Sequence, residues 1–300
     1  MRKETLKDRM GKGLILLDGA MGTELLAQSS DSGKCNDLLN IDSPDIVLGV
    51  HKSYLAAGSD VIITNTFGAN RYALSRHKID NLAEQINTAG AQIARQAAGD
   101  TGYVLGDIGP SGDFLEPLGS LKPQDLKRAF CEQAEALLAG GVDGFIIETM
   151  TALDEIRIAI EAVKSVSDLP ALASMAFDKA GDEFRTMMGV DVESAASAMI
   201  STGVDVAGFN CGTLSLEEYV ELAGKFVSTI KANEQTRFTI FAEPNAGKPE
   251  LIDGQAVYKV TPGDFAAAAE EIHSAGVNII GGCCGTTPAH IEAVAKTLKK

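Results

Sequence analysis

The feature that most constrains the fold of this chain is a regular alternation of short apolar segments with stretches of helical spacing. Eight apolar segments have the length of single strands: Leu14–Leu17, Val61–Ile63, Tyr103–Leu105, Gly144–Ile147, Ala171–Ala173, Val206–Phe209, Thr239–Phe241 and Asn278–Ile280. Helical spacing occupies six of the intervening stretches: Leu82–Ala98, Pro123–Ala139, Leu153–Val166, Val192–Ile200, Leu216–Ile230 and Pro262–Ala275. Strands that are apolar throughout and alternate with helices predict a parallel sheet covered by helices.

A repeated junction supports this arrangement. Four helix ends lead through a glycine into the next strand: Ala57-Gly-Ser-Asp60, Gly140-Gly-Val-Asp143, Thr202-Gly-Val-Asp205 and Ala275-Gly-Val-Asn278. Glycine suits the left-handed conformation that ends many helices. Because no Pro/Gly/Ser-rich linker separates the units, we predict one (β/α)8 TIM barrel over residues 1–300, with its active site at the C-terminal strand ends. A doubly wound open sheet is the alternative, but no Gly-x-Gly-x-x-Gly motif follows the first strand.

Composition and charge exclude several classes of partner. The chain has 300 residues, of which 45% are hydrophobic, and a formal net charge of −15. Nucleic acids and anionic membrane surfaces would repel such a chain. The charged segment at residues 1–9 precedes no signal-peptide core, and every apolar run is shorter than a membrane span. We therefore expect a cytoplasmic protein that binds neither nucleic acid nor membrane.

Three of the five cysteines lie at predicted strand ends. Cys283 and Cys284 are adjacent in a stretch where an apolar strand runs into a helix start, and Cys211 follows another strand. Three thiolates can bind one zinc ion and leave its fourth tetrahedral position for a substrate, which is the arrangement of a catalytic site. Such a site would bind a substrate thiol as a thiolate at neutral pH. We predict that these three cysteines are zinc ligands.

The alternatives are a closed zinc site with four cysteine ligands, or cysteines that are simply buried. A fourth ligand would have to be Cys35, in a polar loop where its side chain is expected to be exposed, or Cys131. Cys131 lies within a predicted helix, where a small core or interface residue is expected, and we assign neither residue to the metal. The four histidines (His51, His77, His273 and His290) lack ligand spacing and are interpreted as packed or solvated.

Two acidic residues at strand ends predict an amino-acid ligand. Asp18 ends the first strand, and Glu148 ends the fourth. Together they can hold an ammonium group by charge-assisted hydrogen bonds, although each alone can equally be a turn cap or part of an ion network. Gly19 and Ala20 permit close approach of a ligand, and a helix that begins near Thr23 offers free N–H groups to a carboxylate.

Two asparagines complete the predicted site. Asn210 directly precedes Cys211, and we expect it to contact the substrate. Asn245, in the segment Glu243-Pro-Asn-Ala-Gly247, would orient the substrate or fill the fourth zinc position when no substrate is bound, unless this segment is only a turn.

Six segments together resemble the homocysteine S-methyltransferase family, and within it most closely the homocysteine-binding domain of cobalamin-dependent methionine synthases. They are Asp18-Gly-Ala-Met-Gly-Thr23, Thr64-Asn-Thr-Phe-Gly-Ala69, Glu148-Thr149, Asn210-Cys-Gly212, Pro244-Asn245 and Gly281-Gly-Cys-Cys-Gly-Thr-Thr-Pro288. The resemblance covers essentially the whole chain and implies a zinc-bearing barrel with the same three cysteine ligands. In that family the zinc-bound homocysteine thiolate attacks a methyl group to give methionine.

The resemblance also implies residue roles. The catalytic residues would be Cys211, Cys283 and Cys284, acting through zinc, together with Glu148. The amino-acid end of homocysteine would lie near Asp18, Gly19, Ala20, Met21 and Glu148.

The predicted methyl donor follows from the absence of a cobalt-ligating motif. No Asp-x-His-x-x-Gly motif, which would ligate cobalt, occurs in the chain, and the sequence ends at Lys300. We therefore expect methylcobalamin carried by a separate corrinoid protein. One alternative is a small donor, namely S-methylmethionine, S-adenosylmethionine or betaine. Another is a non-catalytic zinc- or thiol-binding subunit of a corrinoid methyltransferase complex.

Overall fold

The computed structural model describes residues 4–28, 35–232, 238–252 and 255–299, and its main sheet confirms the predicted barrel. All neighbouring strands of this eight-stranded sheet are parallel, in the order β1-β12-β9-β8-β5-β4-β3-β2. The strands are β1 (Ile15–Leu16), β2 (Val61–Ile63), β3 (Tyr103–Ile108), β4 (Gly144–Met150), β5 (Ala171–Met175), β8 (Val206–Asn210), β9 (Thr239–Glu243) and β12 (Ile279–Ile280). The Asp60 N–H donates to the Leu16 carbonyl at 2.7 Å, so the two end strands also meet and the barrel nearly closes.

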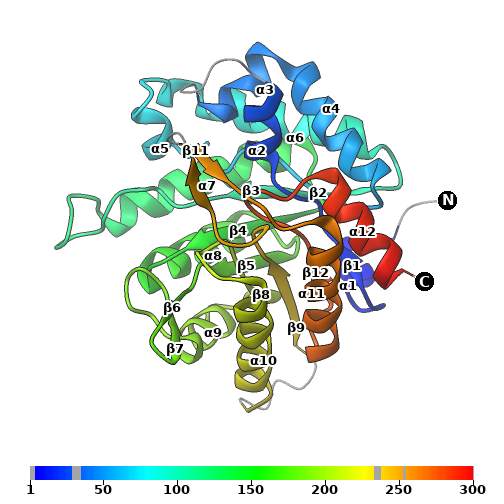
Figure 1. Cartoon of the computed structure of the whole chain (residues 1–300). Coiled ribbons are helices and arrows are strands. Elements are labelled where there is room, and N and C mark those ends of the chain that lie inside the picture. The colour runs from blue at the N-terminus through cyan, green and yellow to red at the C-terminus, as the bar shows by residue number, and fades with distance from the viewer. Residues whose placement is uncertain (1–3, 29–34, 233–237, 253–254, 300) are drawn as a thin grey trace.

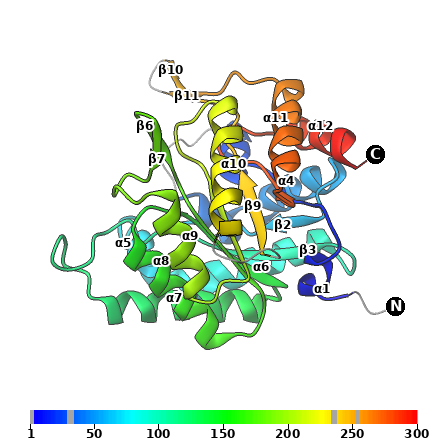
Figure 2. The same ribbon diagram turned by 90° about the horizontal axis from the view of Figure 1, so that it is seen from below.

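Helices surround the strands (Figures 1 and 2). They are α4 (Pro44–Ala56), α6 (Ala83–Ala98), α7 (Pro123–Gly140), α8 (Leu153–Val166), α9 (Val192–Ser201), α10 (Leu216–Ala232), α11 (Pro262–Ala275) and α12 (Pro288–Leu298). All six helices predicted from spacing are present, and α8 and α11 have the predicted bounds. The spacing does not predict α4, whose buried face mixes His51 and Tyr54 with two valines.

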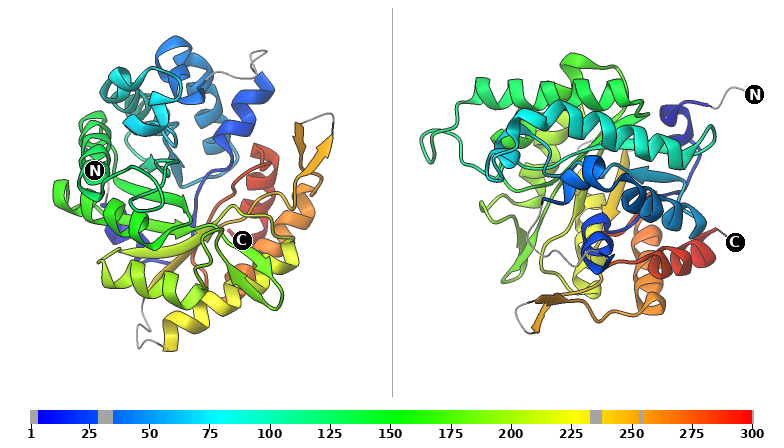
Figure 3. Two further views of the ribbon diagram at one scale, coloured as in Figure 1. Left: turned by 90° about the vertical axis from the view of Figure 1, so that its left-hand side faces the viewer. Right: turned by 90° about the horizontal axis from the view of Figure 1, so that it is seen from above.

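The connections that follow the strands contain further short elements. They are α2 (Met21–Gln28), η1 (Asn36–Leu38), α3 (Leu39–Asp42), α5 (Arg71–Ser75), η2 (Asp80–Leu82) and two antiparallel hairpins, β6–β7 (Asp178–Ala180 and Glu183–Arg185) and β10–β11 (Glu250–Ile252 and Gln255–Val257). The sequence predicts neither hairpin. Figure 3 shows the β3–α7 connection projecting from the barrel, and α1 (Leu6–Met10) precedes β1. Among the helices of the described residues, none is long and apolar enough to cross a membrane.

The repeated glycine junctions have the predicted conformation. The junction glycines have positive φ angles of +107°, +96°, +89° and +120° at Gly58, Gly141, Gly203 and Gly276. Three of the four junctions end in an aspartate, and each of these accepts a backbone N–H from the neighbouring strand: Asp60 from Leu16 (2.8 Å), Asp143 from Val104 (2.9 Å) and Asp205 from Ala171 (3.0 Å). These repeated contacts tie adjacent strands together where the strands begin.

The buried residues form two layers with a period of two along each strand. One cluster contains alternate strand residues, among them Ile15, Leu17, Leu105, Ile146 and Phe241, and therefore fills the barrel interior. The strand residues between them belong to the larger cluster beneath the helices. If this alternation continues toward the C-terminal strand ends, the next inward positions are polar: Asp107, Glu148, Ser174, Asn210 and Glu243. The interior of the barrel thus changes from an apolar core to a polar end within a few residues along its strands.

A buried histidine gives stability a defined pH dependence. His51 on α4 has no exposed surface, and neither ring nitrogen has a partner among the described residues. Burial lowers the pKa of His51 to about 3. The folded state therefore keeps this ring neutral, while the unfolded chain takes up a proton below about pH 6.5. As pH falls from about 6.5 toward 3, we expect this group to lower the free energy of unfolding by about 1.4 kcal/mol per pH unit.

The measurement is urea denaturation of wild type and His51→Leu between pH 4 and 7. Leucine removes both unpartnered nitrogens, so the difference in unfolding free energy between the two proteins should grow as pH falls. The exposed His77, replaced by glutamine, is the matched control. Parallel pH profiles for wild type and His51→Leu would contradict this expectation.

Candidate metal and substrate site

A cavity of about 720 Å³ opens at the C-terminal ends of the strands. Its wall combines the connections after β1, β2, β3, β8 and β12 with the ends of β4 and β9, as a TIM-barrel active site does. The predicted residues that line it are Gly19, Ala20, Met21, Glu148, Cys211, Cys283 and Cys284. Asp18, Asn210 and Asn245 are buried beside it but do not line it.

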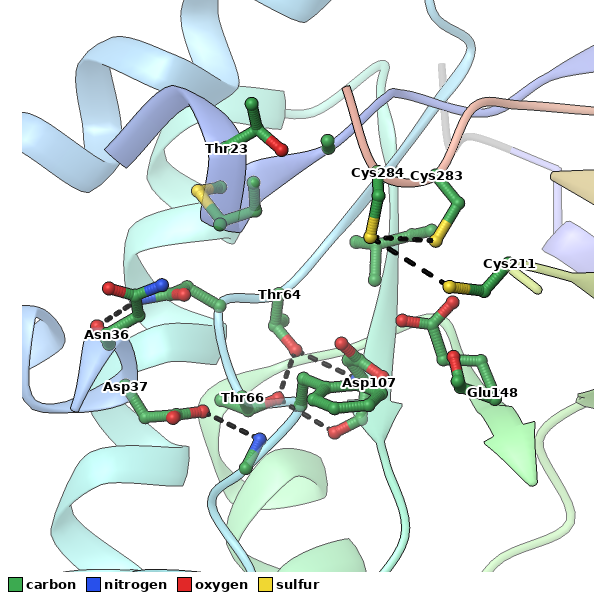
Figure 4. A pocket seen from close by; sticks show the side chains of 18 of the residues that line it. Thr23, Asn36, Asp37, Thr64, Thr66, Asp107, Glu148, Cys211, Cys283 and Cys284 are labelled. Atoms are coloured by element: carbon green, nitrogen blue, oxygen red, sulfur yellow. Dashed lines mark hydrogen bonds between the residues drawn. The ribbon is translucent and has the colours of Figure 1, made fainter. Parts of the chain in front are cut away.

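The three predicted ligand sulfurs lie together in this wall (Figure 4). The Sγ of Cys284 is 3.9 Å from that of Cys211 and 4.0 Å from that of Cys283, and all three lie within 4.8 Å of one another. Sulfurs that share one tetrahedral zinc ion, at the usual Zn–S distance of about 2.3 Å, are roughly 3.8 Å apart. The spacing therefore fits three ligands of a single metal ion. Cys35 and Cys131 are not part of this group.

Cys211 is held in a strained conformation that directs its side chain to the cluster. Its φ angle is +52°, in the left-handed region that residues with a side chain seldom adopt. Its N–H donates to the Glu243 carbonyl (3.2 Å), and its own carbonyl accepts from the Tyr219 hydroxyl (2.6 Å). The following residue, Gly212, also has a positive φ, and its carbonyl accepts from the amide of Asn245 (2.6 Å). Strain of this kind persists where surrounding contacts enforce it.

Backbone hydrogen bonds to the segment that follows β9 position the cysteine pair. The N–H of Cys283 donates to the Pro244 carbonyl (2.8 Å), and the Cys284 carbonyl accepts from the N–H of Ala246 (2.9 Å). The Thr286 hydroxyl donates to the Cys283 carbonyl (2.7 Å) and accepts from the N–H of Ala20 (3.0 Å). The turn that carries both thiols is thereby joined to the connection after β9 on one side and to the start of α2 on the other.

The three thiols interact closely enough to change one another's pKa. The pKa of Cys284 is lowered to about 3 because Cys211, and then Cys283, hydrogen-bond to its sulfur. The pKa of Cys283 is raised because it interacts with the sulfurs of Cys211 and Cys284 and is buried. The cluster therefore favours at least one thiolate, and thiolates are the form in which cysteine binds a metal.

Asn210 connects the metal site to Glu148. Its side-chain oxygen accepts from the Thr149 N–H and the Ser174 hydroxyl, both at 2.8 Å. Its amide nitrogen donates to Glu148 Oε2 (3.0 Å) and Thr149 Oγ1 (2.7 Å) and lies 3.8 Å from the sulfur of Cys283. Thr149 has a φ angle of +60°, at a register shift of β4 that turns the strand end. Asn210 is thus saturated by protein groups and positions Glu148, which itself lines the cavity.

Three buried carboxyl groups, Asp18, Asp107 and Glu243, gather around this end of the barrel together with the half-buried Glu148. Burial raises the pKa of all four, to about 8 for Glu148, whose pKa is raised further by the negative charge of Cys211. One oxygen each of Asp18, Asp107 and Glu243 has no hydrogen-bond partner among the described residues. Buried unpartnered oxygens next to a cavity suit a ligand that brings a positive charge and several donors, such as an ammonium group.

The connection after β1 contains a helix start that can bind an anion. α2 begins at Met21, two residues before the predicted start, and its first turn lines the cavity. The N–H groups of a first helical turn lack acceptors within the helix and attract carboxylates. Gly19 is required there, because a Cβ at this position would lie 2.7 Å from Thr286 Oγ1 and 2.8 Å from the ring of Tyr54.

Several cavity residues were not predicted as site residues. They include Thr64, Thr66, Asp107 and Glu243, of which Thr64 and Thr66 hydrogen-bond to each other (2.6 Å). The two-residue alternation along β3 and β9 is the signal that points Asp107 and Glu243 inward. Cys35 is buried rather than exposed, because its thiol donates to the buried Asp37 (3.3 Å). Cys131 packs between α7 and α8, near Ser165, as an interface residue should.

The fold and the site define a TIM barrel with a thiol-lined cavity, and comparison with known proteins identifies the family. The homocysteine S-methyltransferase family model matches residues 15–298. The methionine synthases of Mycobacterium tuberculosis and Mycobacterium leprae are 32% and 31% identical over 97% and 99% of this chain, which spans 25% of each of them. The metallated form of the homocysteine methyltransferase MmuM from Escherichia coli has a similar fold, with a TM-score of 0.76, 22% identity and 96% of both chains covered. The chain belongs to the homocysteine S-methyltransferase family.

Proposed function

We propose that residues 1–300 form one zinc-dependent methyltransferase domain that transfers a methyl group to the thiol of homocysteine and forms methionine. The observation that carries this proposal is the group of three sulfurs, spaced for one metal ion, in the wall of a cavity that also holds buried carboxyl groups. The names of the relatives, methionine synthase and homocysteine methyltransferase, support the same reaction.

Different residues of the chain would bind the metal ion and the two ends of the substrate. Cys211, Cys283 and Cys284 would hold the zinc ion, which when bound lowers the pKa of the substrate thiol and keeps its sulfur nucleophilic. Glu148, held in place by Asn210, would accept hydrogen bonds from the substrate ammonium group. The first turn of α2 would receive the substrate carboxylate. With both ends of the amino acid held, the sulfur is oriented toward the donor methyl carbon, and its new bond forms as the carbon–donor bond breaks.

We further propose that the donor is a methylated corrinoid carried by a separate protein, which would approach the open end of the cavity. The support is the family resemblance to cobalamin-dependent methionine synthases, which are matched over 97% of this chain at 32% identity. The second candidate is a small donor that enters the cavity beside homocysteine. The cavity volume of about 720 Å³ favours it, since this space exceeds what one amino acid needs.

The test is methionine formation by the zinc-loaded protein with four donors in parallel: free methylcobalamin, S-methylmethionine, S-adenosylmethionine and betaine. Turnover with methylcobalamin alone is the expected result. Turnover with a sulfonium compound or betaine would replace the corrinoid proposal by the small-donor one. If no donor is used although homocysteine binds at zinc, a methylated corrinoid protein becomes the next donor to test. If X-ray absorption detects no added thiol at zinc, the proposed reaction is wrong, and a non-catalytic zinc subunit remains.

A further inference from the structure

Tyr54 joins the two segments that would hold the two ends of the substrate. It lies on α4, is fully buried and is not among the residues that line the cavity. Its hydroxyl donates to the carbonyl of Ala20, just before α2, and to the carbonyl of Thr286, beside the cysteine pair, both at 3.1 Å. A hydroxyl has a single hydrogen, so Tyr54 shares it between two backbone carbonyls from opposite ends of the chain.

Two further hydrogen bonds join the same segments. The N–H of Gly282 donates to the Asp18 carbonyl (2.9 Å), and the N–H of Gly285 donates to the Thr23 hydroxyl (3.2 Å). The first of these contacts precedes the cysteine pair and the second follows it. The turn that carries the thiols is therefore attached to the connection after β1 on both sides of its cysteines.

Close packing leaves little space for this junction to change. A Cβ at Gly19 would lie 2.8 Å from the Tyr54 ring, and a Cβ at Gly282 would lie 2.5 Å from the Thr286 hydroxyl. Both side chains are fully buried. Because a close-packed interior resists deformation, the distance between the first turn of α2 and the thiols is set by the protein and not by the ligand.

A fixed distance between these two places selects the length of the molecule that can reach both. In homocysteine, three carbon atoms separate the sulfur from the carboxylate carbon, whereas in cysteine only two do. A thiol bound at the metal and a carboxylate bound at the first turn of α2 therefore cannot both be reached equally well by the two amino acids. A pocket that adapts to its ligand discriminates weakly against a missing methylene, so rigidity here increases selectivity.

We propose that Tyr54 is a positioning residue that makes the site selective for the length of homocysteine, by fixing the first turn of α2 relative to the thiols. This inference rests on the proposed function. Its test is Tyr54→Phe, which keeps the ring against Gly19 and removes only the hydroxyl that bridges the two segments. The matched control is Tyr103→Phe, since the Tyr103 hydroxyl donates to the Glu4 carbonyl (3.2 Å) at the opposite end of the barrel.

Thiol binding is measured on the cobalt(II)-substituted protein, whose visible absorption changes when a thiolate joins the metal. The probes are homocysteine, cysteine and 3-aminopropane-1-thiol, which is homocysteine without its carboxylate. Wild type should prefer homocysteine to cysteine, and Tyr54→Phe should lower that ratio of affinities about 10-fold, because two carbonyls lose their shared donor and the spacing relaxes. The affinity for 3-aminopropane-1-thiol should equal that of wild type, since this thiol does not use the first turn of α2. Tyr103→Phe should match wild type with all three probes.

An unchanged ratio of homocysteine to cysteine affinity in Tyr54→Phe would overturn the inference. An equal loss of affinity for 3-aminopropane-1-thiol would also overturn it, because damage to the metal site weakens every thiol alike. If no thiol joins the metal in the wild-type protein, the proposed function is overturned instead. The two failures are therefore distinguishable within one set of titrations.

Discussion

Replacing Cys211 by alanine is expected to remove zinc and methyl transfer together while leaving the barrel folded. The substitution deletes one of three sulfurs that lie within 4.8 Å of one another, and the two sulfurs that remain belong to adjacent residues on one turn. Since the binding free energy of a thiolate zinc site is roughly 10–16 kcal/mol over all its ligands, loss of one ligand should weaken zinc binding by on the order of 10³-fold or more. The backbone contacts that hold this position, to Glu243 and Tyr219, do not involve the sulfur.

The measurement is zinc content per chain after dialysis, together with methionine formation and the urea midpoint. Cys131→Ala is the matched control, because this cysteine lies on α7 near Ser165, outside the thiol cluster, and should retain full zinc and activity. A Cys211→Ala protein with one zinc per chain and wild-type turnover would show that the metal assignment is wrong.

The second large effect is expected for Glu148→Gln. Glutamine keeps the size of the side chain and one acceptor oxygen, so the contact with Asn210 can persist, but it cannot form the carboxylate that a bound ammonium group would stabilise. A hydrogen bond between charged groups contributes about 1.5–3 kcal/mol to binding. Its loss should raise KM for homocysteine about 10- to 100-fold. The maximal rate should change less, because this contact binds the substrate and its transition state alike.

A substrate without the amino group makes this prediction specific. Wild type should discriminate strongly between homocysteine and 4-mercaptobutanoate, and Glu148→Gln should lose most of that discrimination. Glu161→Gln is the control: this residue is exposed on α8 and pairs with Lys127 at the surface. Unchanged discrimination in Glu148→Gln would assign the ammonium group to another carboxylate, with Glu243 the next to replace.

Sequence patterns predict the barrel well because its determinants are local. A continuous apolar run such as Val61–Ile63 has few conformations other than a buried strand, and the glycine before it ends the preceding helix in a conformation that other residues disfavour. The β6–β7 and β10–β11 hairpins are not predicted, because they lack the apolar alternation that marks a strand packed on the core; in β10 all three residues are exposed.

The candidate site likewise has one part that the sequence predicts and another that it does not. Cys211, Cys283 and Cys284 are recognisable as a group because each follows a strand, and parallel strands end at one rim. Asn210 is expected to contact the substrate; in the structure it is buried beside the cavity, and its amide is used by Glu148, Thr149 and Ser174. Which of two neighbouring polar residues faces a cavity depends on strand register and twist, and these are properties of the assembled sheet.

The sequence alone determined the parallel barrel, the rim at which its chemistry lies and the residues that can bind a metal, because strand burial, helix ends and thiol chemistry are encoded by residues close together in the chain. Only the tertiary structure decided that the three sulfurs share one metal-sized space and that three buried carboxyl groups gather beside them with the half-buried Glu148. The physical reason is that hydrogen bonding and desolvation depend on distances of a few ångströms between segments far apart in the sequence, which are set when the barrel closes.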